Sequence, residues 1–90
     1  MDYQFDPEKA RENLRKHSVG FDEAIAVFRD PYAVSFEDSD AQGEHRTVTL
    51  GASMTGRLLV VVWTLRRDEV RIISARRATR TERVSYESQL

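Results

Sequence analysis

Arginine is the residue type in this sequence with the clearest chemical meaning. The 90-residue chain has 14 basic side chains, and all of them except Lys9 and Lys16 are arginine. Residues 57–83 carry eight basic and three acidic side chains, a net charge of +5, whereas residues 18–56 carry two and seven, a net charge of −5. Because a guanidinium group binds phosphate or carboxylate through paired hydrogen bonds, this bias favours a phosphate-bearing or acidic partner. The alternative is salt bridging on the surface.

Two adjacent arginines, Arg76 and Arg77, come at the end of the last expected strand. Neighbouring strand residues point to opposite faces of a sheet, so only one of the two can readily reach a given phosphate. The start of the helix that follows adds free N–H groups to an anion site there. The alternative is that the pair closes salt bridges with Glu82 or with the acidic loop.

Two further arginines are expected inside strands. Arg71 is predicted to share a face with Arg77, and Arg46 lies on the second expected strand. A charged side chain inside a half-buried strand is costly unless it is paired or faces an open groove. The alternative to a groove is cross-strand pairing with Glu44 or Glu69.

Candidate proton carriers come at the end of the first expected helix. His17 shares a predicted inward face with Ala10 and Leu14, directly after Lys16. One interpretation is a histidine that packs on the core and is stabilised by the helix dipole. The other is a group that transfers protons near neutral pH.

The aromatic candidates and the acidic loop also have two interpretations. Trp63 is expected in the core, with stacking on a base as the alternative. Tyr86 either packs on the sheet or hydrogen-bonds to a substrate, and His45 is interpreted as a surface residue. The acidic group Asp38, Asp40 and Glu44 has poor ligand geometry, so we expect it to be solvated and predict no metal and no cofactor.

Local signals predict the elements that would position these side chains. Asp6-Pro7 opens a helix that runs to Lys16 or His17, and a stripe of Phe21, Ala24, Ile25 and Phe28 predicts a second helix that ends at Asp30-Pro31. Alternating or apolar stretches predict strands at 32–37, 46–50, 58–65 and 70–75. Thr79-x-x-Glu82 is a capping box that opens a final helix through about Ser88.

The expected fold is α+β: a single small domain over residues 1–90 with the order ααββββα. Short connections predict a four-stranded antiparallel meander, with residues 58–65 central because they are apolar on both faces. We expect the helices to pack on one face and leave the other free for a site. The absence of cysteine excludes disulfides. We expect no signal peptide, no membrane span and a cytoplasmic location.

The two ends of the chain resemble the BrnT family of bacterial toxins. The opening reads Asp6-Pro7-x-Lys9-Ala10-x-x-Asn13-x-x-Lys16-His17-x-Val19-x-Phe21-x-x-Ala24, and the ending reads Ile72-Ile73-Ser74-Ala75-Arg76-Arg77-Ala78-Thr79-x-x-Glu82-Arg83-x-x-Tyr86-Glu87. The middle Glu44-x-Arg46 and the strand ending in Trp63-Thr64 are also similar. Gly20 departs from the family, which usually has Ser as the helix cap.

This resemblance implies a RelE-like ribonuclease toxin of a type II toxin–antitoxin pair. Its implied partner is a BrnA-type antitoxin with a ribbon-helix-helix domain, in a 2:2 heterotetramer that contacts DNA only through the antitoxin and represses its own operon. The implied substrate is RNA, and no membrane is involved.

Metal-independent RNA cleavage by the 2′-hydroxyl needs a base, cations around the charged phosphorane and an acid for the leaving oxygen. The expected catalytic residues are His17, Lys16, Arg76, Arg77 and Tyr86. The residues expected to bind substrate are Arg46, Trp63, Arg71 and Arg80. The alternative function is a non-catalytic, arginine-rich module that binds nucleic acid or an acidic peptide.

Overall fold

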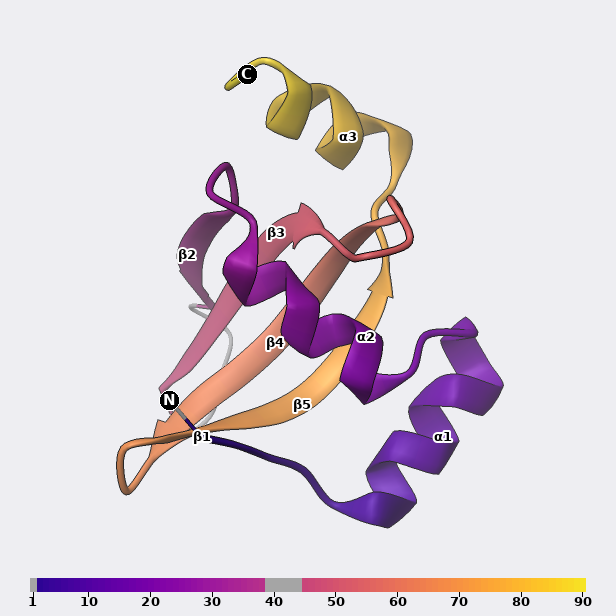
Figure 1. Cartoon of the computed structure of the whole chain (residues 1–90), viewed down its shortest axis with the longest axis vertical. Helices are drawn as coiled ribbons and strands as arrows, with labels where there is room; N and C mark the ends of the chain where they lie inside the picture. Colours follow the sequence, from indigo (N-terminus) through magenta and orange to yellow (C-terminus); the bar gives the residue numbers. More distant parts are fainter. Residues whose placement is uncertain (1, 39–44) are drawn as a thin grey trace.

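The computed structural model describes residues 2–38 and 45–90, which form an α+β fold with three α helices and a five-stranded mixed sheet (Figure 1). A short 3-10 helix, η1, directly follows α2. The elements in chain order are β1 Asp2–Gln4, α1 Pro7–His17, α2 Phe21–Ile25, η1 Ala26–Arg29, β2 Val34–Asp38, β3 Arg46–Ala52, β4 Leu58–Arg66, β5 Glu69–Arg77 and α3 Arg80–Glu87. Asp40 and Glu44 of the acidic group lie outside the described residues.

The predicted helix signals are confirmed. The Asp6 carboxylate accepts a hydrogen bond from the Glu8 N–H at 2.9 Å at the start of α1, with Pro7 in the first turn. Both hydrogen bonds of the Thr79–Glu82 capping box are present at the start of α3. Gly20 caps α2 without a side-chain hydrogen bond. These signals act locally, so the sequence alone specifies where the helices begin.

The predicted inward face of α1 is wrong in part. Ala10 packs against the core, but Leu14 is 54% exposed and His17 is exposed. The buried residue is Asn13, at 6% exposure. A polar residue can face inward here because its amide is fully hydrogen-bonded to backbone groups, as described below.

The sheet order is β1-β5-β4-β3-β2, so β4 lies in the middle as predicted. Strands β2 to β5 form the predicted antiparallel meander. The prediction of four strands is wrong, because β1 adds a parallel strand beside β5 with Tyr3 opposite Val70. The Tyr3 ring also contacts the Phe28 ring, with 5.4 Å between centroids. This packing stabilises a strand of only three residues.

A β-bulge in β5 changes which arginines share a face. Val62 pairs with Ser74 and Trp63 pairs with Ile72, so Ile73 is an extra residue. Side chains alternate with period two, and one extra residue moves every later position to the other face. Arg71 therefore lies on the face of Ser74 and not on that of Arg77, which corrects the prediction.

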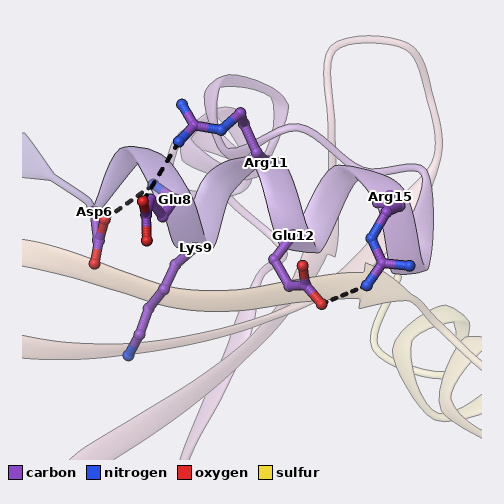
Figure 2. Close-up of a pocket in the computed structure, with 6 residues that line it drawn as sticks. All are labelled: Asp6, Glu8, Lys9, Arg11, Glu12 and Arg15. Atoms are coloured by element: carbon purple, nitrogen blue, oxygen red, sulfur yellow. Dashed lines mark hydrogen bonds and ion pairs between the residues drawn. The ribbon is translucent and has the colours of Figure 1, made fainter.

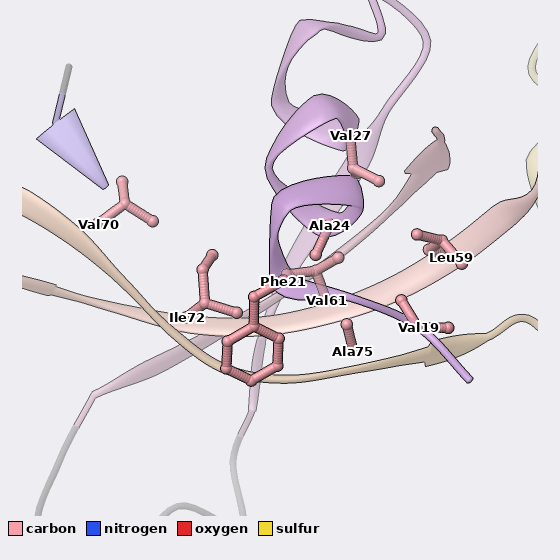
Figure 3. Packing of buried hydrophobic residues seen from close by; sticks show 9 residues of the cluster. All are labelled: Val19, Phe21, Ala24, Val27, Leu59, Val61, Val70, Ile72 and Ala75. Carbon is pink, nitrogen blue, oxygen red and sulfur yellow. The ribbon is translucent and has the colours of Figure 1, made fainter. Parts of the chain in front are cut away.

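The main core lies between the sheet and the segment formed by α2 and η1. Figure 3 shows its members: Val19, Phe21, Ala24 and Val27 against Leu59, Val61, Val70, Ile72 and Ala75. The approach is close at Gly51, where an added Cβ would come within 2.8 Å of Val27 Cγ1. α1 flanks β5, beside this core (Figure 1).

The third helix is on the other face, contrary to the prediction that all helices share one. Tyr86 of α3 packs against Leu50, Leu58 and Val60, whose positions alternate with those of the main core. In Figure 1, α3 lies beyond the end of the sheet, away from α1. One end of this face is therefore covered, and the remainder stays available for a site.

Candidate functional site

Among the described residues, the sheet face opposite α2 carries four arginines, Arg46, Arg66, Arg71 and Arg76, and we call the part of this face that α3 leaves accessible the open face. The strand register places Arg71 opposite Thr64, Ser74 opposite Val62 and Arg76 opposite Val60. Arg46 lies on the same face of β3 and is partly buried. Within the described chain, the Arg46 Nε atom is buried without a hydrogen-bond partner. The open face is thus a partly apolar surface with cationic side chains, which suits an anionic partner.

Arg76 is held in place by Glu82. The two side chains form a bidentate ion pair, with Nη1 to Oε1 at 2.8 Å and Nη2 to Oε2 at 2.9 Å. The hydrogen bonds from Arg76 outweigh partial burial and lower the pKa of Glu82 to about 2. The Arg76 side chain remains 42% exposed. Arg76 therefore forms the salt bridge with Glu82 that the sequence offered as an alternative, and this salt bridge fixes the guanidinium on the open face.

Arg71 is connected to Glu69 through Gln4. Arg71 Nη1 donates to Gln4 Oε1 at 3.2 Å, and Gln4 Nε2 donates to Glu69 Oε2 at 2.5 Å. No direct salt bridge between Arg71 and Glu69 is among the described ion pairs. The other predicted partner, Glu44, lies outside the described residues. Within the described residues, no carboxylate contacts Arg71 directly, so its positive charge on the open face is not neutralised by an ion pair.

A hollow between α1 and β5 contains the predicted proton carriers, and we call it the α1–β5 hollow. Its volume is about 250 Å³, and it is lined by Lys9, Glu12, Asn13, Lys16, His17, Ile73 and Ser74. Lys16 Nζ lies 3.7 Å from the Glu12 carboxylate. Ser74 also belongs to the open face, so the hollow and that face meet at this residue. The structure thus brings His17 and Lys16 to the strand that carries Arg71 and Arg76.

Asn13 attaches α1 to β5 and thereby positions this hollow. Its Nδ2 donates to the carbonyl oxygens of Val19 at 2.9 Å and Ala75 at 2.7 Å, and its Oδ1 accepts from the Ala75 N–H at 3.1 Å. The amide therefore completes the free edge of β5 as a neighbouring strand would. Analysis of the sequence missed this role, although Asn13 belongs to the quoted family motif. Lys9 and Ser74 were also missed as lining residues.

Trp63 and Tyr86 do not belong to the open face. The Trp63 indole lies on the α2 side, where its N–H donates to Thr49 Oγ1 at 2.8 Å and its ring meets Phe28 edge-on. The Tyr86 hydroxyl donates to Asp30 Oδ2 at 2.5 Å. Burial, together with Asp30, raises the pKa of Tyr86 to about 12. Both placements support the packing interpretation of these residues.

Arg77 and Arg80 lie apart from the α1–β5 hollow. Arg77 is opposite Leu59 and so points to the other face from Arg76, as predicted. It lines a second hollow of about 430 Å³, which we call the arginine hollow, with Thr55, Gly56, Arg57, Leu58, Ala78 and Arg83. Arg80 is exposed in the first turn of α3. Sequence reasoning did not single out Arg57 or Arg83, because three separate segments form this hollow.

The outer side of α1 carries a third hollow, of about 530 Å³ (Figure 2). Its charges are compensated along the helix, with Arg15 2.6 Å from Glu12 and Arg11 3.9 Å from Glu8. Such exposed pairs are ordinary surface electrostatics and do not indicate a site. His45 is also a surface residue, with Nε2 3.0 Å from a Glu37 carboxylate oxygen.

Two further observations on the described residues concern metal ligands and membrane spans. The described residues contain no group of three His, Cys, Asp or Glu side chains able to hold a metal ion. None of their helices has the length and apolar character needed to cross a membrane.

The fold and the cationic sheet face define a small α+β protein suited to binding an anionic chain. Residues 5–82 match the family described as "Ribonuclease toxin, BrnT, of type II toxin-antitoxin system". The chain therefore belongs to the BrnT family of ribonuclease toxins, which confirms the resemblance of the two end motifs. Membership gives it RNA as substrate and an antitoxin as partner.

The fold is also that of a solved structure. The crystal structure at 1.1 Å resolution of the Brucella abortus ribonuclease toxin, BrnT, is similar with a TM-score of 0.68 and 19% sequence identity. The similarity covers 89% of this chain and 99% of that one. A comparison with curated protein sequences finds no match.

Proposed function

We propose that this toxin cleaves RNA without a metal ion, where the α1–β5 hollow meets the open face. The observation that carries the proposal is the shared position of Ser74, which lines the hollow and lies between Arg71 and Arg76 on the open face. The proposed proton carriers, His17 and Lys16, line the hollow beside the strand that carries the proposed phosphate-binding arginines, which supports the proposal. This is the combination that cleavage by the 2′-hydroxyl needs.

The proposed reaction uses only side chains of this chain. The 2′-oxygen attacks the adjacent phosphorus, the bond to the 5′-oxygen breaks, and the products end in a 2′,3′-cyclic phosphate and a 5′-hydroxyl. His17 and Lys16 carry the proton from the 2′-hydroxyl and the proton to the leaving oxygen. Arg76 and Arg71 stabilise the negative charge of the phosphorane.

Glu82 is proposed to position Arg76. A guanidinium held by a bidentate carboxylate has one fixed orientation, so less side-chain freedom is lost when a phosphate binds. Arg46, whose Nε has no partner within the described chain, and Arg80 at the start of α3 are proposed to contact flanking parts of the substrate.

The proposed partner is a BrnA-type antitoxin with a ribbon-helix-helix domain. The net charge of +5 over residues 57–83 favours an acidic surface or tail that covers the arginines. A ribbon-helix-helix domain is a dimer, so the proposed assembly is a 2:2 heterotetramer in the cytoplasm, with DNA contacted by the antitoxin only. Residues 1–90 act in it as one toxin domain.

Paired histidine variants test the proposed site. His17→Ala should reduce cleavage of RNA by at least about a hundredfold, since it removes a proton carrier. His45→Ala is the matched control, because His45 is an exposed histidine on a different element. Equal activity of both variants and the wild type would remove His17 from the site. RNA binding without cleavage by the wild type would favour the arginine-rich binding module.

A further inference from the structure

The arginine hollow has a rigid wall on one side. Arg57 Nε donates to Glu23 Oε2 at 2.9 Å, and Arg57 Nη2 donates to the Ser18 carbonyl at 3.0 Å. The Glu23 carboxylate also accepts hydrogen bonds from Ser53 Oγ at 2.7 Å and Thr55 Oγ1 at 2.8 Å. These bonds join α2 to the β3–β4 turn and hold the wall in one conformation.

The hollow carries positive charge that the described residues do not compensate. Of its three guanidinium groups, Arg57 is paired with Glu23. Across residues 2–38 and 45–90, neither Arg77 nor Arg83 has a carboxylate within ion-pair distance. Three positive charges against one negative charge leave about +2 around a concave surface. Like charges placed together repel, and an anion from outside the chain would relieve that repulsion.

The position of the hollow beside Arg76 favours an RNA backbone as the anion. Arg77 directly follows Arg76, and the two side chains leave β5 on opposite faces. A single RNA strand that crosses the end of β5 would therefore meet Arg76 on the open face and Arg77 at the rim of the hollow. Successive phosphates along one backbone suit such a pair of sites, because each can be held by a separate arginine.

We propose that the arginine hollow is a second phosphate-binding subsite, which holds a backbone phosphate of the RNA outside the cleaved bond. This inference rests on the proposed function, since the open face must first bind the substrate. Arg77 and Arg83 supply the contacts, and Arg57 forms the fixed wall. Arg77 is then a substrate-binding residue and does not act on the reacting phosphate.

The test measures RNA affinity against RNA length and salt. The probes are 2′-O-methyl oligoribonucleotides of two to eight nucleotides, which cannot be cleaved by 2′-hydroxyl attack. The variant is Arg77→Ala/Arg83→Ala, compared with the wild type and with Arg11→Ala/Arg29→Ala, a control that removes the same charge from exposed positions elsewhere. All four side chains are exposed, so folding should be unchanged, as thermal unfolding would show.

The expected result is a length-dependent loss. The Arg77→Ala/Arg83→Ala variant should bind the shortest probe as the wild type does, but the longer probes about tenfold more weakly. For the longer probes, the slope of log affinity against log salt concentration should be shallower for this variant than for the wild type by about 0.7, which is the contribution of one phosphate on a single strand. The control variant should show neither change for any length.

Other outcomes separate this inference from the proposed function. If the wild type binds none of the probes, the proposed function itself fails. If the wild type binds them and the Arg77→Ala/Arg83→Ala variant matches it at every length and salt concentration, only the subsite is refuted. Equal weakening for short and long probes would place these arginines at the cleaved phosphate. Loss of antitoxin binding with unchanged RNA binding would assign the hollow to an acidic protein. Both results overturn the inference.

Discussion

Replacing Asn13 by alanine should destabilise the protein by about 3 kcal/mol. The substitution leaves three backbone groups without their side-chain partner, namely the Ala75 N–H, the Ala75 carbonyl and the Val19 carbonyl. Ala75 and Val19 are fully buried, so water does not replace the amide. Each lost hydrogen bond costs about 1 kcal/mol. The total stability of a 90-residue chain is roughly 5–13 kcal/mol, so the variant remains folded.

Urea unfolding followed by the fluorescence of the single tryptophan measures this loss. With a slope of about 2 kcal/mol per molar urea, the midpoint should fall by about 1.5 M. Leu14→Ala is the matched control on the same helix, and its 54% exposure predicts a change of under about 0.5 kcal/mol. A larger loss for Leu14→Ala than for Asn13→Ala would refute the assignment of Asn13 as the residue that attaches α1 to the sheet.

Three further predictions concern charge and proton transfer. Arg76→Ala should slow RNA cleavage by on the order of 10²-fold, and Arg77→Ala should slow it by much less. Only the Arg76 substitution removes charge from the reacting phosphate. Equal cleavage rates for the two variants would contradict this prediction. The Arg57 guanidinium lowers the pKa of Glu23 from the ordinary 4.5 to about 2, so its contribution to stability is complete above about pH 4.5 and is lost as the pH falls toward 2. The stability of Glu23→Gln should therefore not show this loss between about pH 4.5 and 2 in acid unfolding. A profile like that of the wild type would contradict the Glu23–Arg57 ion pair. Tyr86→Phe should lose about 1 kcal/mol in urea unfolding with cleavage intact, whereas a fall in kcat alone would give Tyr86 a catalytic role.

Local signals explain why so many of the elements could be predicted from the sequence. The Asp6-Pro7 start and the Thr79–Glu82 capping box depend on residues within one helical turn. The apolar residues on both faces of β4 likewise indicate that it is the central strand of the sheet. Such features need no knowledge of the distant chain.

The errors come from interactions between distant segments. The partner of Asn13 on β5 is 62 residues away, and β1 is a strand only because β5 and Phe28 lie beside it. The bulge at Ile73 leaves no mark in the residue types, yet it decides which face Arg71 occupies. Because a site is defined by which side chains share a face, these distant effects limit its prediction more than that of the fold.

The same limit explains the outcome for the candidate site. The sequence suggested Glu82 as a salt-bridge partner of Arg76, and the structure contains this pair, whose members are six residues apart. The sequence could not show that Trp63 points to the α2 side of the sheet or that Tyr86 donates its hydroxyl to Asp30, 56 residues earlier in the chain. Those placements depend on the packing of α2, η1 and α3.

Analysis of the cleavage products in the presence of EDTA tests the central claim most directly. Purified toxin, freed of antitoxin, is incubated with RNA in excess EDTA, and the new termini are identified by mass spectrometry. The proposed site predicts cleavage at an undiminished rate, with a 2′,3′-cyclic phosphate on one product and a 5′-hydroxyl on the other. Cleavage only after addition of magnesium or zinc, or products with a 3′-hydroxyl and a 5′-phosphate, would contradict the account.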